Sequence, residues 1–510
     1  MADGTSARGP TACRTLIRRR ESEGESMYES GGLLIDGAWR GASDGECIVV
    51  RSPATGEPVG SVPAATEADE EAALAAAERG FARWSKTPAW ERAVVLRRAA
   101  DLLRARNDTY ALLMSGETGK PLLEARGEIN ASADQFEWYA EEAKRIYGHT
   151  IAGRHADERL AVGYQPVGPC LALSAWNFPM LLPSRKIAAA LAAGCSVVAR
   201  PASEAPGSCM ALGQVLLDAG LPAGVLGILT GHAKPMVARL VQSKVIRKVS
   251  LTGSVPVGKE ILRLAADHVK KVTMELGGHA PVIVHADADP VESAKKLATT
   301  KFRNCGQVCI SPSRFYVHRS ILAPFAETFA AVARELRIGD GRDPATTLGP
   351  MIRARAVESA LSLIEDARAR GARVLAGGQR PSHLERGHFI EPTVLVDVPD
   401  DARIMCEEPF APVAPIAAFD DVTDAITRAN ATEFGLAAYV FTHDSALAAV
   451  TAEALEAGMV GINETLLATA EAPFGGIKES GFGREGGSLG ILDYLTPKYI
   501  RHRLIVRNGT

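Results

Sequence analysis

A cysteine in a turn is the first residue of this sequence whose type and setting could do chemistry. Cys309 ends the segment FRNCGQVC, residues 302–309, in which Gly306 favours a non-helical turn directly after an amphipathic helix. A thiol in a turn is open to substrate, and it becomes a strong nucleophile as the thiolate. A small, inert cysteine is the commoner alternative, and this segment alone leaves both open.

Two other segments place polar side chains at the ends of predicted strands. Glu275 stands before Gly277 and Gly278, where partial burial would raise the pKa of its carboxyl and let it activate water. Asn177, in WNFP at 176–179, could donate its amide to a developing oxyanion. A surface carboxylate and a turn-forming asparagine are the respective alternatives.

A phosphate site is predicted without the usual glycine fingerprint, because the sequence has no GxGxxG in its first βαβ region. Gly253 lies at a tight strand-to-helix turn, and Ser254 follows near a helix N-terminus. Backbone N–H groups at such a terminus suit a pyrophosphate. An ordinary serine N-cap is the alternative.

The elements that must position these residues alternate between strand and helix. Residues 68–144 read as helices, and short apolar runs separated by helical stretches follow at 166–290 and again after 284. This alternation predicts an α/β protein with two parallel sheets and crossover helices. Residues 494–500 could form an edge strand that pairs with another chain or within its own subunit.

Composition narrows the classes of function. The chain has 510 residues, 46% hydrophobic and 23% charged, with a formal charge of −3, which predicts two or more globular domains and no nucleic-acid or membrane partner. No run is long enough for a membrane helix, and no HExxH or similar spacing predicts a metal. Eight dispersed cysteines favour reduced thiols in the cytoplasm. Residues 1–30 read as a disordered extension.

Together these segments resemble the aldehyde dehydrogenase superfamily over essentially residues 33–499. Six ordered motifs carry the resemblance: WNFP at 176–179, TGS with Gly258, ELGG at 275–278, FRNCGQVC ending at 309, EEPF at 407–410 and PFGGIKESGFGRE at 473–485. The resemblance implies a Rossmann-type cofactor domain (31–146 and 166–277), a second α/β catalytic domain (278–478) and a small β oligomerisation element (147–165 and 488–507). It also implies a homo-dimer or homo-tetramer.

The family's chemistry carries over onto matching positions. The resemblance implies that Cys309 attacks an aldehyde, that Asn177 and the Cys309 N–H hold the oxyanion, and that Glu275 activates water to hydrolyse the thioester. NAD(P) would be bound by Trp176, Arg200, Ser203, Gly253, Ser254, Glu408 and Phe410. Many NAD-preferring relatives carry a glutamate at position 203, so a serine there beside Arg200 favours NADP, with NAD as the alternative.

For the substrate, the chain is most similar to the succinate-semialdehyde dehydrogenase branch, in segments such as SGETGKPLLEARGEI from Ser115 and the DYLTPKYI ending. This implies that Arg185 and Arg303 clamp the far carboxylate of succinate semialdehyde, and that Thr469 supplies a hydroxyl. A pair of surface salt bridges is the alternative for the arginines. Glutarate or 2-oxoglutarate semialdehyde, a general aldehyde, thioester or ester hydrolysis and a fold without catalysis are the alternative functions. A Cys305–Cys309 disulfide is left open.

Overall fold

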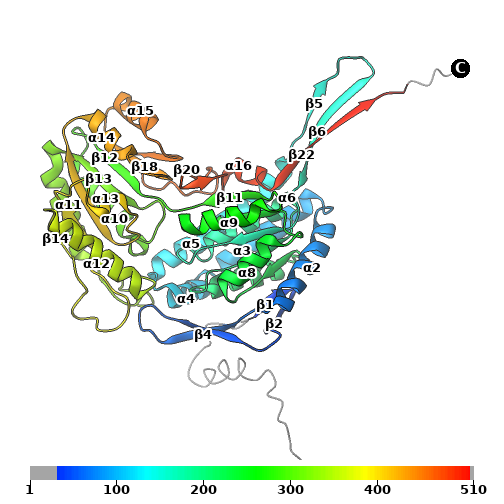
Figure 1. Cartoon of the computed structure of the whole chain (residues 1–510), viewed down its shortest axis with the longest axis horizontal. Helices are drawn as coiled ribbons and strands as arrows, with labels where there is room; N and C mark the ends of the chain where they lie inside the picture. Colours follow the sequence, from blue (N-terminus) through cyan, green and yellow to red (C-terminus); the bar gives the residue numbers. More distant parts are fainter. Residues whose placement is uncertain (1–31, 506–510) are drawn as a thin grey trace, which may run out of the picture.

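A computed structural model describes residues 32–505 of this chain. Residues 1–31 and 506–510 lie outside the described residues, and the extension predicted over residues 1–30 lies with them. Two bodies, each built around a sheet, and a projecting three-stranded arm make up most of the described part (Figure 1).

The first sheet has eight strands and a parallel centre. Its spatial order is β2 (Ala38–Arg40), β1 (Leu33–Ile35), β9 (Leu226–Ile228), β8 (Val197–Arg200), β7 (Cys170–Leu173), β10 (Lys248–Thr252), β11 (Lys271–Glu275) and β21 (Gly481–Phe482). The strands from β9 to β11 run parallel, whereas β1, β2 and β21 pair antiparallel at the edges. The Rossmann-type sheet that the resemblance implied is therefore present.

Helices cover both faces of this sheet, because successive side chains of a strand point to opposite faces. Leu171 and Leu173 of β7 pack with α2 (Glu67–Trp84), α8 (Ala233–Gln242) and α9 (Val255–Ala266). Cys170 and Ala172 pack on the other face. The helices there are α3 (Ala89–Ala105), α4 (Asn107–Thr118), α5 (Leu122–Glu142), α6 (Leu181–Ala193) and α7 (Pro206–Asp218). The short 3₁₀ helix η1 (Ala143–Arg145) follows α5.

The second sheet has seven strands. Its order is β14 (Arg373–Ala376), β15 (Thr393–Val396), β16 (Val413–Phe419), β13 (Pro312–His318), β12 (Ala280–Val284), β18 (Ala437–Phe441) and β19 (Met459–Ile462). Only β14 pairs antiparallel within it, and β12 is buried along its whole length, as a parallel strand covered on both faces should be.

Helices of the second body include the one that leads to Cys309. They are α10 (Pro290–Phe302), α11 (Leu322–Glu335), α12 (Ala354–Ala369), α13 (Arg403–Cys406), α14 (Val422–Asn430) and α15 (Ser445–Ala454), with the 3₁₀ helices η2 (Arg303–Gly306) and η3 (Arg319–Ile321). The α10 helix begins clearly, because the Asp289 side chain accepts the N–H groups of Val291 and Glu292, and Pro290 occupies the first turn.

The arm is a three-stranded antiparallel sheet of β5 (His149–Ala152), β6 (Glu158–Pro166) and β22 (Leu495–Arg503). It projects from the first body (Figure 1). A short α16 (Gly487–Leu492) leads into β22, and the remaining strands are β3 (Cys47–Arg51), β4 (Pro58–Pro63), β17 (Phe434–Gly435) and β20 (Ile477–Lys478). The domain boundaries stay a prediction.

Candidate active site

Cys309 follows a sharply turned segment between α10 and β13. Within η2, Asn304 and Cys305 adopt left-handed backbone angles, with φ of 49° and 56°. At Gly306 an added Cβ would lie 2.2 Å from the carbonyl oxygen of Ala411, so only glycine lets the turn approach that segment. The predicted turn is present, and the Cys309 side chain keeps partial exposure at its end.

Asn177 lies beside the backbone that precedes the thiol. It follows β7, is 4% exposed and donates one N–H of its amide to the carbonyl oxygen of Gln307 over 3.1 Å. The backbone oxygen of Asn177 accepts from Lys120 and from the Asn304 side chain, over 2.9 and 3.0 Å. The second N–H of the Asn177 amide is therefore the group available to an oxyanion.

Glu275 ends β11 and is buried. Its two carboxylate oxygens have no hydrogen-bond partner within residues 32–505. Burial, followed by repulsion from Glu485, raises the pKa of this carboxyl well above its usual value, and Lys186 and Arg185 offset part of the rise. The surface-carboxylate alternative is therefore wrong for Glu275.

The glycines after Glu275 connect it with the thiol segment. An added Cβ at Gly278 would lie 2.5 Å from the carbonyl oxygen of Cys309. Burial, together with the charges of Glu408 and Glu275, raises the pKa of the Cys309 thiol to about 12, and Arg185 acts in the opposite direction. These charges act on the thiol from both bodies, so the candidate site lies between them.

The residues predicted at the nicotinamide, Glu408 and Phe410, each contact another residue of the site. The rings of Trp176 and Phe410 meet edge to face with centroids 5.8 Å apart. Glu408 accepts the N–H of Gly278 over 3.1 Å, and burial raises the pKa of its carboxyl to about 7. Phe410 has a φ of 42°, a strained value for a bulky residue of the kind that concentrates at functional sites.

The predicted phosphate turn follows β10 at the same sheet edge as Glu275, and the N–H of Gly253 donates to the Glu275 carbonyl over 3.0 Å. Ser254 is the exposed N-cap of α9, and its side chain makes no capping bond. The alternative of a serine that caps its own helix is therefore wrong here. The first N–H groups of α9 are available to an anion, which fits a pyrophosphate.

Arg200 and Ser203 are in direct contact at the end of β8. The Arg200 guanidinium donates to the Ser203 hydroxyl over 2.7 Å, while its Nε has no partner among the described residues. Burial lowers the pKa of Arg200 to about 10. A cation that keeps an unused donor beside an exposed hydroxyl fits a 2′-phosphate better than a bare ribose hydroxyl.

Arg185 and Arg303 carry no ion-pair or hydrogen-bond partner within residues 32–505, which overturns the salt-bridge alternative. Arg185, on α6, is 2% exposed and stacks over the ring of Phe474 at 4.2 Å. Arg303 lies over the ring of Phe178 at 5.6 Å. The site therefore holds two guanidinium groups that form no ion pair with another described residue.

Among the described residues, the structure gives no contact that supports two other predicted features, the Thr469 hydroxyl and a Cys305–Cys309 disulfide. Thr469 is partly exposed in the loop between β19 and β20, and no side-chain hydrogen bond joins it to either arginine. Its role stays a prediction. Cys305 and Cys309 both carry free thiols, and Cys305 is 1% exposed within the core of the second body.

Several residues that support the site had no role in the sequence-based prediction. Lys186 is buried and contacts both Thr252 and Glu485 over 2.5 Å, close to Glu275. Lys120 and Glu128 form a buried ion pair beside Asn177. Lys120 and Glu128 lie in the recognised segment that begins at Ser115, but Lys120 contacts Asn177 and Lys186 contacts Glu485 across long stretches of sequence, so only the folded chain reveals these contacts.

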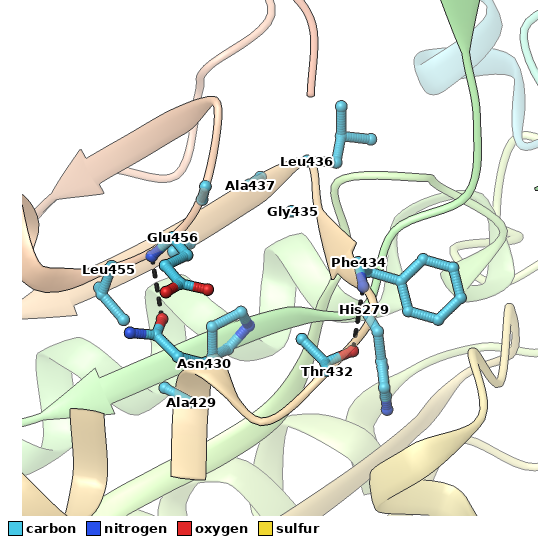
Figure 2. Close-up of a pocket in the computed structure, with 13 residues that line it drawn as sticks. His279, Ala429, Asn430, Thr432, Phe434, Gly435, Leu436, Ala437, Leu455 and Glu456 are labelled. Atoms are coloured by element: carbon cyan, nitrogen blue, oxygen red, sulfur yellow. Dashed lines mark hydrogen bonds between the residues drawn. The ribbon is translucent and has the colours of Figure 1, made fainter. Parts of the chain in front are cut away.

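A small cavity beside the second sheet is separate from the predicted site. Figure 2 shows a cavity of about 10 Å³ beside β17 and β18, with room for about one water molecule, and none of its lining residues is a predicted site residue. Within residues 32–505, no cluster of His, Cys, Asp and Glu could hold a metal ion. No helix in the same range is long and apolar enough to cross a membrane.

Fold and site together define an α/β protein with two mainly parallel sheets. Asn177 and Glu275 lie at or after the carboxyl ends of strands in the first sheet, and Cys309 belongs to the body of the second. Residues 39–500 match the model of the aldehyde dehydrogenase family, and this chain belongs to that family.

Several members of this family are similar to this chain over nearly its whole length. The chain is 46% identical over 467 residues to succinate-semialdehyde dehydrogenase [NADP(+)] of Escherichia coli, covering 92% of this chain and 96% of the relative. It is 46% identical over 466 residues to glutarate-semialdehyde dehydrogenase of Pseudomonas putida, covering 91% and 96%. A crystal structure of succinate-semialdehyde dehydrogenase from Burkholderia pseudomallei superposes with a TM-score of 0.92 at 42% identity, covering 94% of this chain and 99% of that one.

Proposed function

We propose that this chain oxidises succinate semialdehyde to succinate with NADP or NAD. The observation that carries the substrate is that the guanidinium groups of Arg185 and Arg303 lack an ion-pairing anion among the described residues. A carboxylate at the far end of the aldehyde would supply that anion, and arginine binds a carboxylate through two parallel hydrogen bonds. The names of the relatives above, a succinate- and a glutarate-semialdehyde dehydrogenase, support an aldehyde of this kind.

The proposed reaction begins with attack of the Cys309 thiolate on the aldehyde carbon. The oxyanion that forms accepts hydrogen bonds from the Asn177 amide and the Cys309 backbone N–H. When bound, the nicotinamide supplies a hydride acceptor, so that the adduct becomes a thioester. Glu275 then takes a proton from water, the resulting hydroxide attacks the thioester, and succinate and the thiol are released.

Removing the amide tests the oxyanion step. Asn177→Ala should lower kcat by about a hundredfold or more with little change in KM, because the lost bond forms mainly in the transition state. Steady-state kinetics checks this, with Asn130→Ala on the exposed face of α5 as the control. A raised KM with unchanged kcat would instead assign Asn177 to substrate binding.

For the cofactor, the proposal is NADP in preference to NAD. The α9 N-terminus with Gly253 and Ser254 would hold the pyrophosphate, and Arg200 with Ser203 would hold the 2′-phosphate. Trp176 would lie along the adenosine, and Glu408 with Phe410 would fix the nicotinamide ribose and ring. The contact of Arg200 with Ser203 and its unpaired Nε support this assignment.

We further propose a homo-dimer or homo-tetramer and a cytoplasmic location, with no nucleic-acid partner. The outer edge of β22 lies at the end of its sheet, which supports pairing with a second copy. The cytoplasmic location rests on the six free cysteines among the described residues. The disulfide-bonded Cys47 does not support it.

The test of the substrate compares initial NADPH and NADH formation with succinate semialdehyde, glutarate semialdehyde and uncharged hexanal. Succinate semialdehyde should give the highest kcat/KM, and Arg303→Ala should raise KM for the two carboxylated aldehydes and leave hexanal unchanged. Arg355→Ala, on the exposed face of α12, is the matched control.

Each other outcome has its own meaning. Preference for glutarate semialdehyde would support the arginine clamp and indicate a pocket that fits a longer substrate. Preference for hexanal, with no effect of Arg303→Ala, would overturn the carboxylate clamp but keep the dehydrogenase. Product without NAD(P) would favour hydrolysis.

A further inference from the structure

The turn that presents Cys309 needs external support. Asn304 and Cys305 are consecutive non-glycine residues in the left-handed region, which L-residues rarely adopt. Such backbone persists where surrounding contacts fix it. Since Arg303 begins this turn and Cys309 follows it, whatever holds the turn also places the proposed substrate clamp and the nucleophile.

A carboxylate from α5 holds the turn at its strained position. Glu124, in the first turn of α5, accepts the backbone N–H of Asn304 through Oε2 over 2.7 Å. The side chains of Asn304 and Gln307 donate to backbone oxygens nearby, which links the turn to itself and to Asn177. Glu124 is therefore an ionisable anchor that reaches the turn from the other body.

Charged groups surround this carboxylate. Lys120, just before α5, and Arg303, on the turn, attract its charge; Glu128, one helical turn further along α5, repels it. Lys120 is already engaged by Glu128 and by the Asn177 carbonyl. Glu124 forms no ion pair within residues 32–505, and because it accepts the N–H of Asn304 it lies beside the backbone of Arg303, the preceding residue, whose charge attracts it.

We propose that Glu124 is a positioning and specificity residue: its hydrogen bond to Asn304 fixes the turn that carries Arg303 and Cys309, and its negative charge competes with the substrate carboxylate for Arg303. The second half of this inference rests on the proposed function. The first half concerns the nucleophile and holds for any aldehyde.

The proposed competition predicts the direction in which KM changes with pH. Burial raises the pKa of Glu124 to about 7; Lys120, Arg303 and the Asn304 N–H work in the opposite direction. A carboxylate bound at Arg303 disfavours the charged form of Glu124, so binding is tighter when Glu124 is protonated. KM for succinate semialdehyde should therefore rise from pH 6 to pH 8, relative to KM for hexanal, by about three- to tenfold.

The ratio of the two KM values isolates this effect. Burial also raises the pKa of Glu408 to about 7, but Glu408 acts on the thiol and thus on both aldehydes. The carboxyl of the substrate itself is ionised throughout this range. Protein groups that affect both aldehydes equally cancel in the ratio of the KM values, so the pH dependence of this ratio reports the charge of Glu124.

Two variants separate the bond from the charge. Glu124→Gln keeps an oxygen that accepts the Asn304 N–H but removes the charge, so its KM ratio should be constant from pH 6 to pH 8 at the low-pH value of the native protein. Glu124→Ala removes both, so kcat for hexanal and the rate of Cys309 alkylation by iodoacetamide should each fall about tenfold or more. Asp134→Asn, exposed on the same helix, is the control that should leave both unchanged.

The two halves fail separately. If Glu124→Ala keeps the hexanal kcat and the alkylation rate within about twofold of the native protein, the positioning role is wrong. If Glu124→Gln keeps the native pH dependence of the KM ratio, the competing charge is wrong. A native protein that does not prefer carboxylated aldehydes would overturn the proposed substrate, and the hexanal and alkylation measurements would still decide the positioning role. If Glu124→Ala does not fold, the alkylation rate of Cys309 in Glu124→Gln decides the positioning role. A native rate, together with the failure of Glu124→Ala to fold, supports the hydrogen bond to Asn304. A rate about tenfold lower contradicts it.

Discussion

At the scale of single residues, burial disfavours the charged form of both groups that are proposed to handle protons. Burial raises the pKa of the Cys309 thiol to about 12 and that of the Glu275 carboxyl well above its usual value. The reactive forms are the thiolate and the carboxylate, so each rate that depends on them should rise with pH. Lys186 and Arg185 lower the pKa of Glu275, but they do not cancel the rise that burial causes.

Alkylation of Cys309 measures the thiolate directly. In the protein without cofactor, the rate with iodoacetamide should rise about tenfold per pH unit from pH 7 to pH 10, because the thiolate fraction grows in that proportion below the pKa. Peptide mass spectrometry gives the rate for Cys309, with the exposed Cys406 as an internal reference. A plateau for Cys309 below pH 8 would contradict a raised pKa.

Cofactor preference is also decided by single residues. Arg200→Ala should lower kcat/KM for NADP by about tenfold and leave that for NAD within about twofold, because only NADP has the 2′-phosphate that the guanidinium would bind. Ser203→Glu should act in the same direction by repulsion. Equal losses with both cofactors would show that Arg200 supports the fold rather than the phosphate.

The sequence predicted which residues gather at the site but not what surrounds them. Asn177, Glu275 and Cys309 lie in motifs that signal a strand end or a turn, and these local signals sufficed to find them. The setting of Glu124 could not be predicted, because it contacts Asn304 across 180 positions of the chain. The sequence also left the arginines open between substrate and salt bridge, and only the absence of partners in the described residues decides against the latter.

At the scale of elements, α5 connects the two bodies through one end. Glu128 accepts the N–H groups of Met180 and Leu181 at the start of α6, over 2.9 and 3.1 Å, and pairs with Lys120. Lys120 in turn donates to the Asn177 carbonyl. The first two turns of α5 therefore fix the start of α6 with Glu128 and the thiol turn with Glu124, while Lys120 holds the oxyanion donor between them.

Removing the lysine should affect stability and catalysis together. Lys120→Met leaves Glu128 charged and buried without its partner, so the free energy of unfolding should fall by about 3 kcal/mol. It should also lower kcat by about tenfold, because the Asn177 backbone loses one of its donors. Urea unfolding and steady-state kinetics measure the two effects.

The double variant Lys120→Met with Glu128→Gln separates them. The glutamine keeps an oxygen for the α6 N–H groups and carries no charge, so most of the lost stability should return while kcat stays low. If kcat recovers together with stability, Lys120 acts only through the fold. Asp134→Asn again serves as a surface control on α5.

Helices and strands were easier to predict than their contacts. Residues 321–336 and 354–370 read as helices, and α11 and α12 occupy Leu322–Glu335 and Ala354–Ala369. The apolar period that identifies a helix is local, whereas the antiparallel return of β21 to the edge of the first sheet depends on a pairing with β11 some 200 residues earlier. Local patterns carry no signal for that pairing.

At the scale of the whole molecule, none of the predicted site residues lies on the arm. All nine residues of β22 pair with β6 on one side, and β22 forms the end of its sheet in the described residues. Tyr499 and Ile500 on it are 54% and 55% exposed, and Ile151 on β5 is exposed as well. An exposed strand with large apolar side chains on a projecting arm is a surface that a second copy would cover (Figure 1).

The oligomer should therefore depend on β22. The double variant Tyr499→Asp with Ile500→Asp should shift the protein to monomers in sedimentation velocity, because a charged strand edge disfavours pairing with another chain. Val269→Asp, at an apolar residue that is 93% exposed in the turn before β11, should keep the native assembly. Since the thiol, amide and carboxylate all belong to one chain, we expect the monomer to react with iodoacetamide at Cys309 at the native rate. A native oligomer in the β22 variant would place the interface elsewhere, and a loss of thiol reactivity on dissociation would show that the arm of a second copy supports the site.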